Sequence, residues 1–310
     1  MHSTPLTSHK LKDELLTHPL MLSVGSLGLS TFMSRSIYGM VDWRPVVICV
    51  SSDILAIGLD HYFDQKPMQL YALKTENREM TAIFNQAKLL LVTSAILLLF
   101  ALASSPAWTW IMVTVFLAPA LLWDFRLFTF GDKRQRKHNW RSDDSSGRNA
   151  FSIKRIPGMK AVIIGIIRGC GTFAVVNSIL THSTSSDPSI WDPTQIIIWS
   201  TINRACHAVM ADVRDFHEDW EKQVPTIPVL LKSVFRTKML LTAVHLGTML
   251  LYPYNPYIVF ASLYATVLVW FLNENSPRGL YRLSFHSQTL TALLYGGVEA
   301  AKWYTSYQMM

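Results

Sequence analysis

Three carboxylates recur at helical spacing in the segment Asp212-Val213-Arg214-Asp215-Phe216-His217-Glu218-Asp219. Separations of three, four and seven residues place Asp212, Asp215 and Asp219 on one face of a helix. Like charges on one face repel one another, and a hard divalent cation relieves that repulsion. Mg²⁺ typically binds through one or two carboxylates together with phosphate oxygens and water. The segment therefore predicts a magnesium site, with a solvated helix end as the alternative.

A second acidic pair, Asp60 and Asp64, lies one helical turn apart in Asp60-His61-Tyr62-Phe63-Asp64. Two carboxylate sets that face each other across a helical bundle would hold Mg²⁺ ions that bridge a diphosphate and stabilise it as a leaving group. The apolar interior of such a bundle would take an attached hydrocarbon chain. This chemistry requires both acidic segments to lie at the same end of the bundle.

The elements available to position these residues are membrane helices. Half of the 310 residues are apolar and only 16% are charged, whereas soluble proteins carry about 25% charge. Crossing about 30 Å of hydrocarbon takes roughly 20 helical residues. Nine such stretches occur, at approximately 19–40, 44–59, 81–104, 107–128, 157–181, 194–211, 227–250, 255–273 and 286–306. We therefore predict an all-α, polytopic membrane protein of about nine transmembrane helices.

The distribution of positive charge predicts the topology. Most of the 28 Lys and Arg residues lie in the N-terminus and in the connections after the second, fourth, sixth and eighth predicted helices. The opposite helix ends hold only Arg35, Arg44 and Lys302. This asymmetry predicts a cytoplasmic N-terminus, with both acidic segments on the cytoplasmic side. It leaves the organelle open, the endoplasmic reticulum among the candidates. The net charge of +7 thus reflects topology and does not indicate nucleic-acid binding.

One membrane domain is expected over residues 19–310, preceded by a cytoplasmic tail over residues 1–18. The tail has no apolar core, so it is not expected to be a cleaved signal peptide. Residues 131–156 are rich in Ser, Asp and Arg, which predicts a flexible, basic cytoplasmic loop. The cysteines Cys49, Cys170 and Cys206 all lie in apolar stretches, so no disulfide framework is expected.

Basic side chains near the acidic segments would neutralise the charge of a departing diphosphate. The candidates are Lys66, Lys74, Arg126, Lys133, Lys160, Arg214 and Lys222. Polar side chains within the sixth predicted helix, where an unpaired charge is costly, are candidates to line the cavity. They are Asn203, Arg204 and His207. Topology and packing are the alternative explanations for these residues.

The acidic segment at Asp212 resembles the DxRDxxxD element of the UbiA superfamily of intramembrane prenyltransferases. The trailing Val224-Pro225-Thr226-Ile227-Pro228-Val229 and the basic segment at residues 154–160 are also similar to that family. The resemblance covers nearly the whole chain. It implies nine helices around a central cavity open to the cytoplasmic side, and a prenyl diphosphate substrate. It also implies Mg²⁺ held by carboxylates, here Asp60, Asp64, Asp212, Asp215 and Asp219.

The first acidic segment departs from the NDxxDxxxD pattern of that family. Asp60 stands in place of Asn, His61 in place of Asp, and Met68 in place of the last Asp. Two metal-binding carboxylates remain, but fewer of the residues that would recognise an acidic acceptor are present. We therefore expect Mg²⁺-dependent ionisation of an all-trans C15 or C20 prenyl diphosphate, followed by cyclisation, as in the membrane terpene cyclases of the superfamily. Candidate aromatic side chains to face the carbocation are Phe116, Trp123, Phe125 and Trp199.

Two other functions remain open. Transfer of the prenyl group to an aromatic or quinone-precursor acceptor is the alternative reaction of the same fold. A transporter or an inactive scaffold is the non-enzymatic alternative, although the sequence lacks the repeat symmetry and broken helices typical of transporters. The expected partners are the prenyl diphosphate and the lipid bilayer, with no nucleic acid and no obligatory protein partner.

Overall fold

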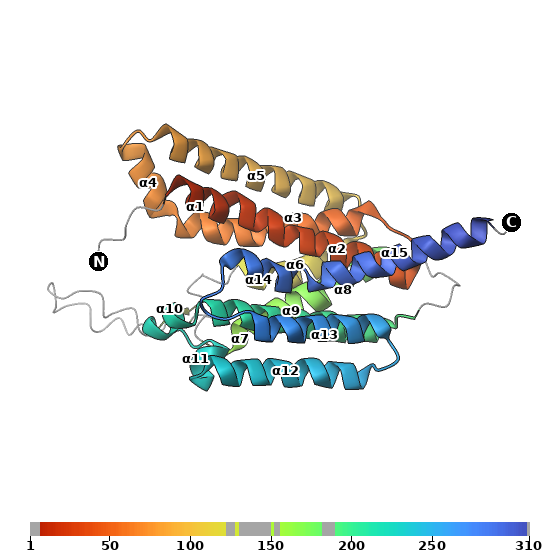
Figure 1. The fold of residues 1–310 in the computed structure, drawn as a ribbon. Coiled ribbons are helices and arrows are strands. Elements are labelled where there is room, and N and C mark those ends of the chain that lie inside the picture. Colours follow the sequence, from red (N-terminus) through yellow and green to blue (C-terminus); the bar gives the residue numbers. More distant parts are fainter. Residues whose placement is uncertain (1–6, 122–127, 130–149, 152–155, 182–189, 309–310) are drawn as a thin grey trace.

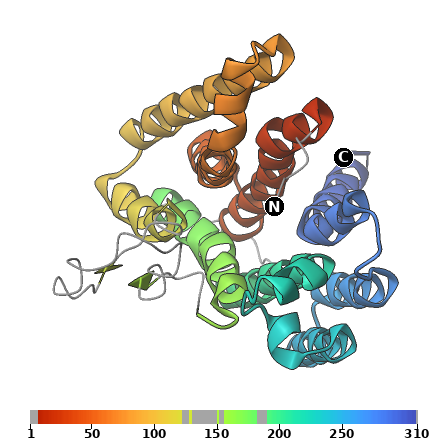
Figure 2. The same cartoon turned by 90° about the vertical axis from the view of Figure 1, so that its left-hand side faces the viewer.

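The structure is a computed structural model in which residues 7–121, 128–129, 150–151, 156–181 and 190–308 are described. Long helices run side by side along the length of the molecule (Figure 1). A view from one end shows these helices arranged around the central α2 and α3 (Figure 2). Four candidate residues, Trp123, Phe125, Arg126 and Lys133, lie outside the described residues, as does most of the predicted loop at 131–156.

Each of the nine predicted stretches contains a long helical segment. These segments are α2 (His18–Tyr38), α3 (Trp43–Asp64), α5 (Arg78–Ala103), α6 (Ala107–Leu121), α7 (Met159–Ile166) with η5 (Ile167–Gly171) and α8 (Thr172–Leu180), α9 (Pro193–Arg214), α12 (Val234–Leu251), α13 (Pro256–Phe271) and α15 (Ser287–Gln308). Five helices in the described part are long and apolar enough to cross a membrane, and α6 and α13 are shorter apolar helices. The all-helical membrane fold is thus confirmed, while nine crossings remain a prediction.

Short elements gather mostly at one end of the bundle. They are α1 (Ser8–Lys12), η1 (Asp13–Thr17), α4 (Lys66–Lys74), α10 (Phe216–Glu221), α11 (Ile227–Leu231) and α14 (Arg278–Phe285), beside a minimal antiparallel pair of β1 (Phe128–Thr129) and β2 (Ala150–Phe151). Both acidic segments end a long helix at this end, since α3 stops before α4 and α9 stops before α10 (Figure 1, left). The sequence prediction that they share one end of the bundle is therefore correct.

Local sequence fixes where the two site helices begin. The Asp42 carboxylate accepts the Arg44 amide proton at 2.8 Å and caps α3. The Asp192 carboxylate accepts the Thr194 amide proton at 2.9 Å and caps α9, which has Pro193 at its first position. Such caps satisfy amides that have no partner inside the helix. From these starts, α3 and α9 each run 22 residues to their acidic ends.

The outer faces of the bundle are apolar. Leu89 and Ile96 on α5 and Phe271 on α13 are more than 60% exposed. A soluble protein rarely leaves such faces uncovered, whereas hydrocarbon lipid solvates them. The interior at the end opposite the acidic segments contains a buried aromatic cluster in which Phe32 and Trp199 contact Trp191.

Close helix packing sets the distance between α7–η5 and α9. Gly165 and Gly169 lie four residues apart and face α9 without side chains. A Cβ atom on Gly169 would stand 2.6 Å from the Thr201 Cα and N atoms, and one on Gly165 would stand 2.7 Å from the Thr201 carbonyl oxygen. Small residues spaced in this way allow two membrane helices to approach closely.

Replacing Gly169 with Ala is therefore expected to lower the free energy of unfolding by about 1–3 kcal/mol, because the clash is with backbone atoms that cannot move aside. The measurement is the thermal unfolding midpoint of the purified protein in detergent. Gly247→Ala is the matched control, since nothing lies within 4 Å of its added Cβ. Equal midpoints for the two variants would contradict this account of the α7–η5/α9 contact.

Candidate functional site

A cavity of about 540 Å³ opens among α2, α3, α7, α9 and α14 at the acidic end of the bundle. Its wall combines charged side chains with apolar ones. The apolar part comes mainly from Met21, Leu22, Ala56, Ile57, Ile163, Ile164, Ile167, Ala208 and Ala211. The volume is typical of small-molecule binding sites, which span about 300–1,000 Å³. The cavity thus has room for an amphiphilic ligand with a polar end and an apolar body.

The first acidic segment lies on the cavity wall. Asp60 and Asp64 both line it, together with the neighbouring His61. The His61 ring meets the His18 ring edge-on with centroids 5.2 Å apart, and His18 also lines the cavity. Helical spacing predicted that Asp60 and Asp64 share a face, and the cavity lies on that face.

The second acidic segment sits behind two cations that line the cavity. Asp212 is only 1% exposed. Its Oδ1 accepts a hydrogen bond from the Lys160 ammonium, with Nζ at 2.6 Å. The Asp215 carboxylate binds both the Nε and Nη2 of Arg214, at 2.8 and 2.6 Å. Lys160 and Arg214 line the cavity, whereas Asp212 and Asp215 do not. Lys160 and Arg214 therefore lie between these two carboxylates and the cavity.

The surroundings of Lys160 indicate whether the carboxylates of the second acidic segment suit a divalent cation. The ammonium interacts electrostatically with Asp212, Asp219 and Asp215, so one positive charge already lies within the field of three carboxylates. Asp219 Oδ2 is buried, and the Thr226 hydroxyl interacts with this carboxylate. The three carboxylates are hard oxygen donors, which fit Mg²⁺.

The Asp219 carboxyl lies on α10, beyond the end of α9. Burial raises its pKa above the ordinary value, as do Asp215 and Glu218, while Lys160 opposes the shift. No cluster of three or more His, Cys, Asp or Glu residues in the described part is close enough to hold a metal ion by protein ligands alone. A magnesium ion here would need oxygen ligands from a substrate or from water, as is usual for Mg²⁺.

The remaining predicted site residues divide into two groups. Lys66, Lys74 and Lys222 are exposed and do not line the cavity; Lys66 lies over the Phe63 ring and Lys222 pairs with Glu218. Of the three polar residues predicted on the sixth helix, His207 lines the cavity, and its Nδ1 lies 3.2 Å from the Ser284 hydroxyl. The other two, Asn203 and Arg204, are buried behind the cavity wall.

Arg204 contacts helices that the sequence analysis did not connect with it. Its Nη1 donates to the Phe285 carbonyl at 2.9 Å, and its Nη2 donates to the Gly25 carbonyl at 3.3 Å. The guanidinium carbon also lies 4.3 Å from the centre of the Phe285 ring. Arg204 therefore joins α9, α14 and α2, which is a packing role.

Side chains from near the two ends of the described chain also line the cavity, at its opening, which we call the mouth. Asp13 and Glu14 precede α2, and Tyr281 and Arg282 lie on α14. Arg282 Nη2 donates to Asp13 Oδ1 at 2.9 Å, so a contact between residues 269 positions apart borders the cavity. The sequence analysis missed these residues because each lies outside the predicted helices and no spacing connects them.

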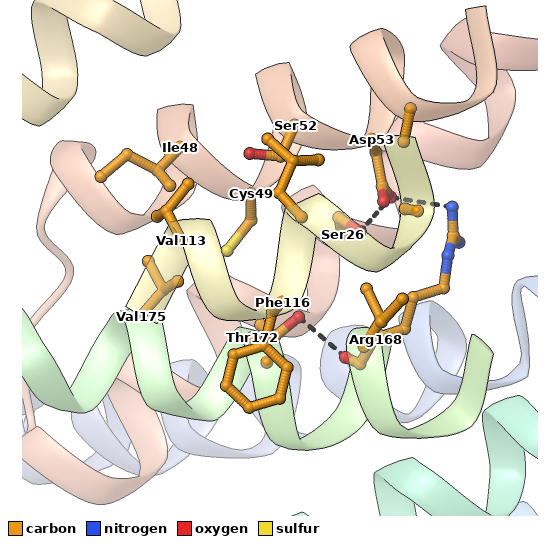
Figure 3. Close-up of a pocket in the computed structure, with 15 residues that line it drawn as sticks. Ser26, Ile48, Cys49, Ser52, Asp53, Val113, Phe116, Arg168, Thr172 and Val175 are labelled. Carbon is orange, nitrogen blue, oxygen red and sulfur yellow. Dashed lines mark hydrogen bonds and ion pairs between the residues drawn. The ribbon is translucent and has the colours of Figure 1, made fainter. Parts of the chain in front are cut away.

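An ion pair deeper in the cavity includes Asp53, which the sequence analysis also missed. Arg168 Nη2 lies 3.0 Å from Asp53 Oδ2, and the Ser26 hydroxyl donates to the same oxygen (Figure 3). Asp53 and Arg168 line both the large cavity and a smaller pocket of about 60 Å³ beside it. The signal was an aspartate inside a predicted membrane helix, seven residues before Asp60 and on the same face. Phe116 lines this smaller pocket, whereas Trp199 belongs to the buried core.

Comparison with known proteins identifies the fold. No protein-family model and no curated protein matches the chain. Among solved structures, the chain is similar to a UbiA homologue from Archaeoglobus fulgidus bound to GPP and Mg²⁺, with a TM-score of 0.55 and 13% identity over 93% of this chain and 98% of that one. The same homologue bound to DMAPP and Mg²⁺ gives a TM-score of 0.56 with the same identity and coverage.

Proposed function

The chain has the fold of UbiA homologues, and we propose that it is a UbiA-superfamily enzyme that ionises a prenyl diphosphate with the help of Mg²⁺. The observation that carries this proposal is the cavity itself. The carboxylates Asp60 and Asp64 on α3 and the cations Lys160 on α7 and Arg214 on α9 line it, and the wall between these residues and the deeper Asp53–Arg168 pair is largely apolar. The structures with this fold that contain GPP or DMAPP together with Mg²⁺ support the same ligand class.

The residues proposed to hold Mg²⁺ are the carboxylates of the two helix ends, Asp60, Asp64, Asp212, Asp215 and Asp219. When bound, the metal would supply positive charge to the diphosphate leaving group. Lys160 and Arg214 line the cavity beside these carboxylates and would donate hydrogen bonds to diphosphate oxygens. Placing cations where negative charge develops lowers the barrier to breaking the allylic C–O bond.

The apolar wall of the cavity is proposed to hold the prenyl chain. Met21, Leu22, Ile163 and Ile164 lie between the mouth and the Asp53–Arg168 pair, and they exclude water from the cation formed when diphosphate leaves. A C15 or C20 chain folded in this space would bring a distal double bond to C1. We propose that cyclisation follows, because the first acidic segment lacks two of the family's aspartates, at His61 and Met68.

The proposed enzyme lies in the lipid bilayer as a single domain over residues 19–310, with the cavity mouth and the N-terminus on the cytoplasmic side. The positive-inside distribution of Lys and Arg supports this orientation. No obligatory protein partner is proposed.

Product analysis without an acceptor tests the proposed reaction. Membranes that contain the protein are supplied with Mg²⁺ and all-trans C10, C15 or C20 prenyl diphosphate, and the expected result is a cyclic product whose formation stops on chelation with EDTA. Membranes without the protein are the control. Release of diphosphate only after aromatic acids or phenols are added would instead establish transfer to an acceptor. No consumption of any prenyl diphosphate under either condition would contradict the proposed function.

A further inference from the structure

Deep in the cavity lies a polar site that the ionisation step does not use. The Asp53 and Arg168 side chains are only 13% and 9% exposed, and they pair at 3.0 Å. Ser26 on α2 donates to the same Asp53 oxygen (Figure 3). An ion pair at membrane depth is costly, and its residues usually serve a function.

The ion pair lies deeper in the cavity than the acidic residues at its opening, where the metal is proposed to bind. Asp53 precedes Asp60 by seven residues of α3, which is a rise of about 10 Å along the helix. Arg168 follows Lys160 by eight residues on the continuous α7–η5 segment, a similar depth. Between the two levels the cavity wall includes Ala56 and Ile164. A prenyl chain anchored at the mouth by its diphosphate would thus reach the pair with its hydrocarbon part.

The smaller pocket beside the ion pair is suited to water. Its volume is about 60 Å³, and a buried water needs about 10–15 Å³ and two to four polar partners. Ser52 Oγ and Arg168 Nη1 are buried without hydrogen-bond partners among the described residues. Both residues line this pocket, as does Asp53 (Figure 3). Two unsatisfied polar groups and a carboxylate therefore belong to residues that line a space that water molecules fit.

We propose that this pocket supplies the water that ends the reaction, so that the product is a cyclic alcohol. The inference rests on the proposed prenyl diphosphate chemistry. A lone pair of the water oxygen forms the C–O bond to the electron-deficient carbon of the cyclised cation. One water O–H bond breaks, and the Asp53 carboxylate takes that proton. A cation, a water and a carboxylate thus become a neutral alcohol and a neutral carboxylic acid.

Asp53 is the catalytic residue of this step, and Arg168 is a positioning residue. Arg168 holds the Asp53 carboxylate through Nη2, and its Nη1, which has no partner among the described residues, is available to donate a hydrogen bond to the water oxygen. Asp53 returns its proton to solvent through the cavity mouth after the product has left. Ser52 lines the same pocket, and its hydroxyl would hydrogen-bond to water held there.

The test uses the full-length protein in membranes, Mg²⁺, all-trans C15 and C20 prenyl diphosphates, and water enriched in ¹⁸O. Two variants disturb the site differently. Asp53→Asn keeps the shape of the side chain but removes the base. Ser52→Val fills the pocket and removes a partner of the water, while it leaves the ion pair intact. Ser104→Val is the matched control, because Ser104 is exposed at the far end of α5.

The unmodified protein is expected to form a cyclic alcohol that carries one ¹⁸O atom. In both variants Mg²⁺-dependent diphosphate release should stay within about threefold of the unmodified protein, while the ratio of cyclic alcohol to cyclic hydrocarbon falls. For Asp53→Asn the fall should be about 10²-fold, the usual effect of losing a general base, and for Ser52→Val it follows from exclusion of the water. Ser104→Val should change neither quantity. If Asp53→Asn does not accumulate, the double variant Asp53→Asn, Arg168→Gln removes the unpaired buried charge and Ser52→Val tests the water directly.

Two results would overturn the inference. One is Mg²⁺-dependent diphosphate release without any cyclic alcohol, which refutes the water pocket and leaves the ionisation chemistry standing. The other is an unchanged alcohol fraction in both variants. An unmodified protein that releases no diphosphate would instead refute the proposed function, and the inference with it.

Discussion

Replacing Asp212 and Asp215 together with Asn is expected to abolish turnover, lowering Mg²⁺-dependent diphosphate release by a factor of about 10³ or more. The physical reason is the loss of two negative charges at the proposed metal site, where the leaving group depends on positive charge for its stabilisation. The measurement is diphosphate release from the prenyl diphosphate that the unmodified protein prefers, across a range of Mg²⁺ concentrations.

The fold should survive this double substitution. Lys160, the partner of Asp212, has a side chain that is 43% exposed, so its freed ammonium can be hydrated. Glu221→Gln is the matched control, since Glu221 is exposed on the neighbouring α10 and its loss removes a charge outside the site. A double variant that unfolds at the same temperature as the unmodified protein and still turns over at the normal rate would show that these carboxylates do not bind the metal.

Replacing Asp60 and Asp64 together with Asn tests the opposite wall and is expected to lower diphosphate release by about 10²–10³-fold. Both carboxylates line the cavity. A metal site built from two helix ends binds the diphosphate less well when the carboxylate charges of either end are removed. The Mg²⁺ concentration required for half-maximal activity should also rise, because fewer oxygen ligands remain.

Glu79→Gln serves as the control for this second variant. Glu79 is exposed in the first turn of α5, at the same end of the bundle. Activity of the Asp60/Asp64 double variant within about threefold of the control would place the metal on α9 alone and would contradict the two-sided site.

Sequence reasoning reached the helices and the common location of the acidic segments, because both depend on local patterns. Apolar length predicts a membrane helix, and a spacing of four predicts that Asp60 and Asp64 share a face. The same reasoning was less successful for Asp215. It assumed one continuous helix through Asp219, but α9 ends at Arg214 and α10 begins at Phe216, with Asp215 at the junction.

Contacts between distant segments were beyond the reach of sequence patterns. Lys160 meets Asp212 from another helix, 52 residues away, and no spacing rule connects them. Arg204 was expected at the cavity and lies behind its wall, where it donates to the Phe285 carbonyl. Phe285 is the last residue of α14, and a helix-terminal carbonyl has no acceptor role within its own helix, so it is available to a side chain. Only the fold brings the two together.

Asp53 was not among the site residues predicted from the sequence. It stands alone in an apolar stretch, without the repeated spacing that made the two acidic segments visible. A charged residue within a membrane helix is by itself a reason to expect a function, and the structure adds the partner, Arg168, from a segment more than a hundred residues away.

The central claim is that carboxylates of α3 and α9 jointly hold the metal that binds a prenyl diphosphate. Its most direct test is an experimental structure with a non-cleavable prenyl thiodiphosphate and Mn²⁺ in place of Mg²⁺, in which anomalous scattering locates the metal. We expect metal peaks at about 2.1 Å from carboxylate oxygens of both helix ends, with the prenyl chain pointing toward Asp53. Metal bound at only one of the two acidic segments, or a diphosphate outside the cavity, would contradict it.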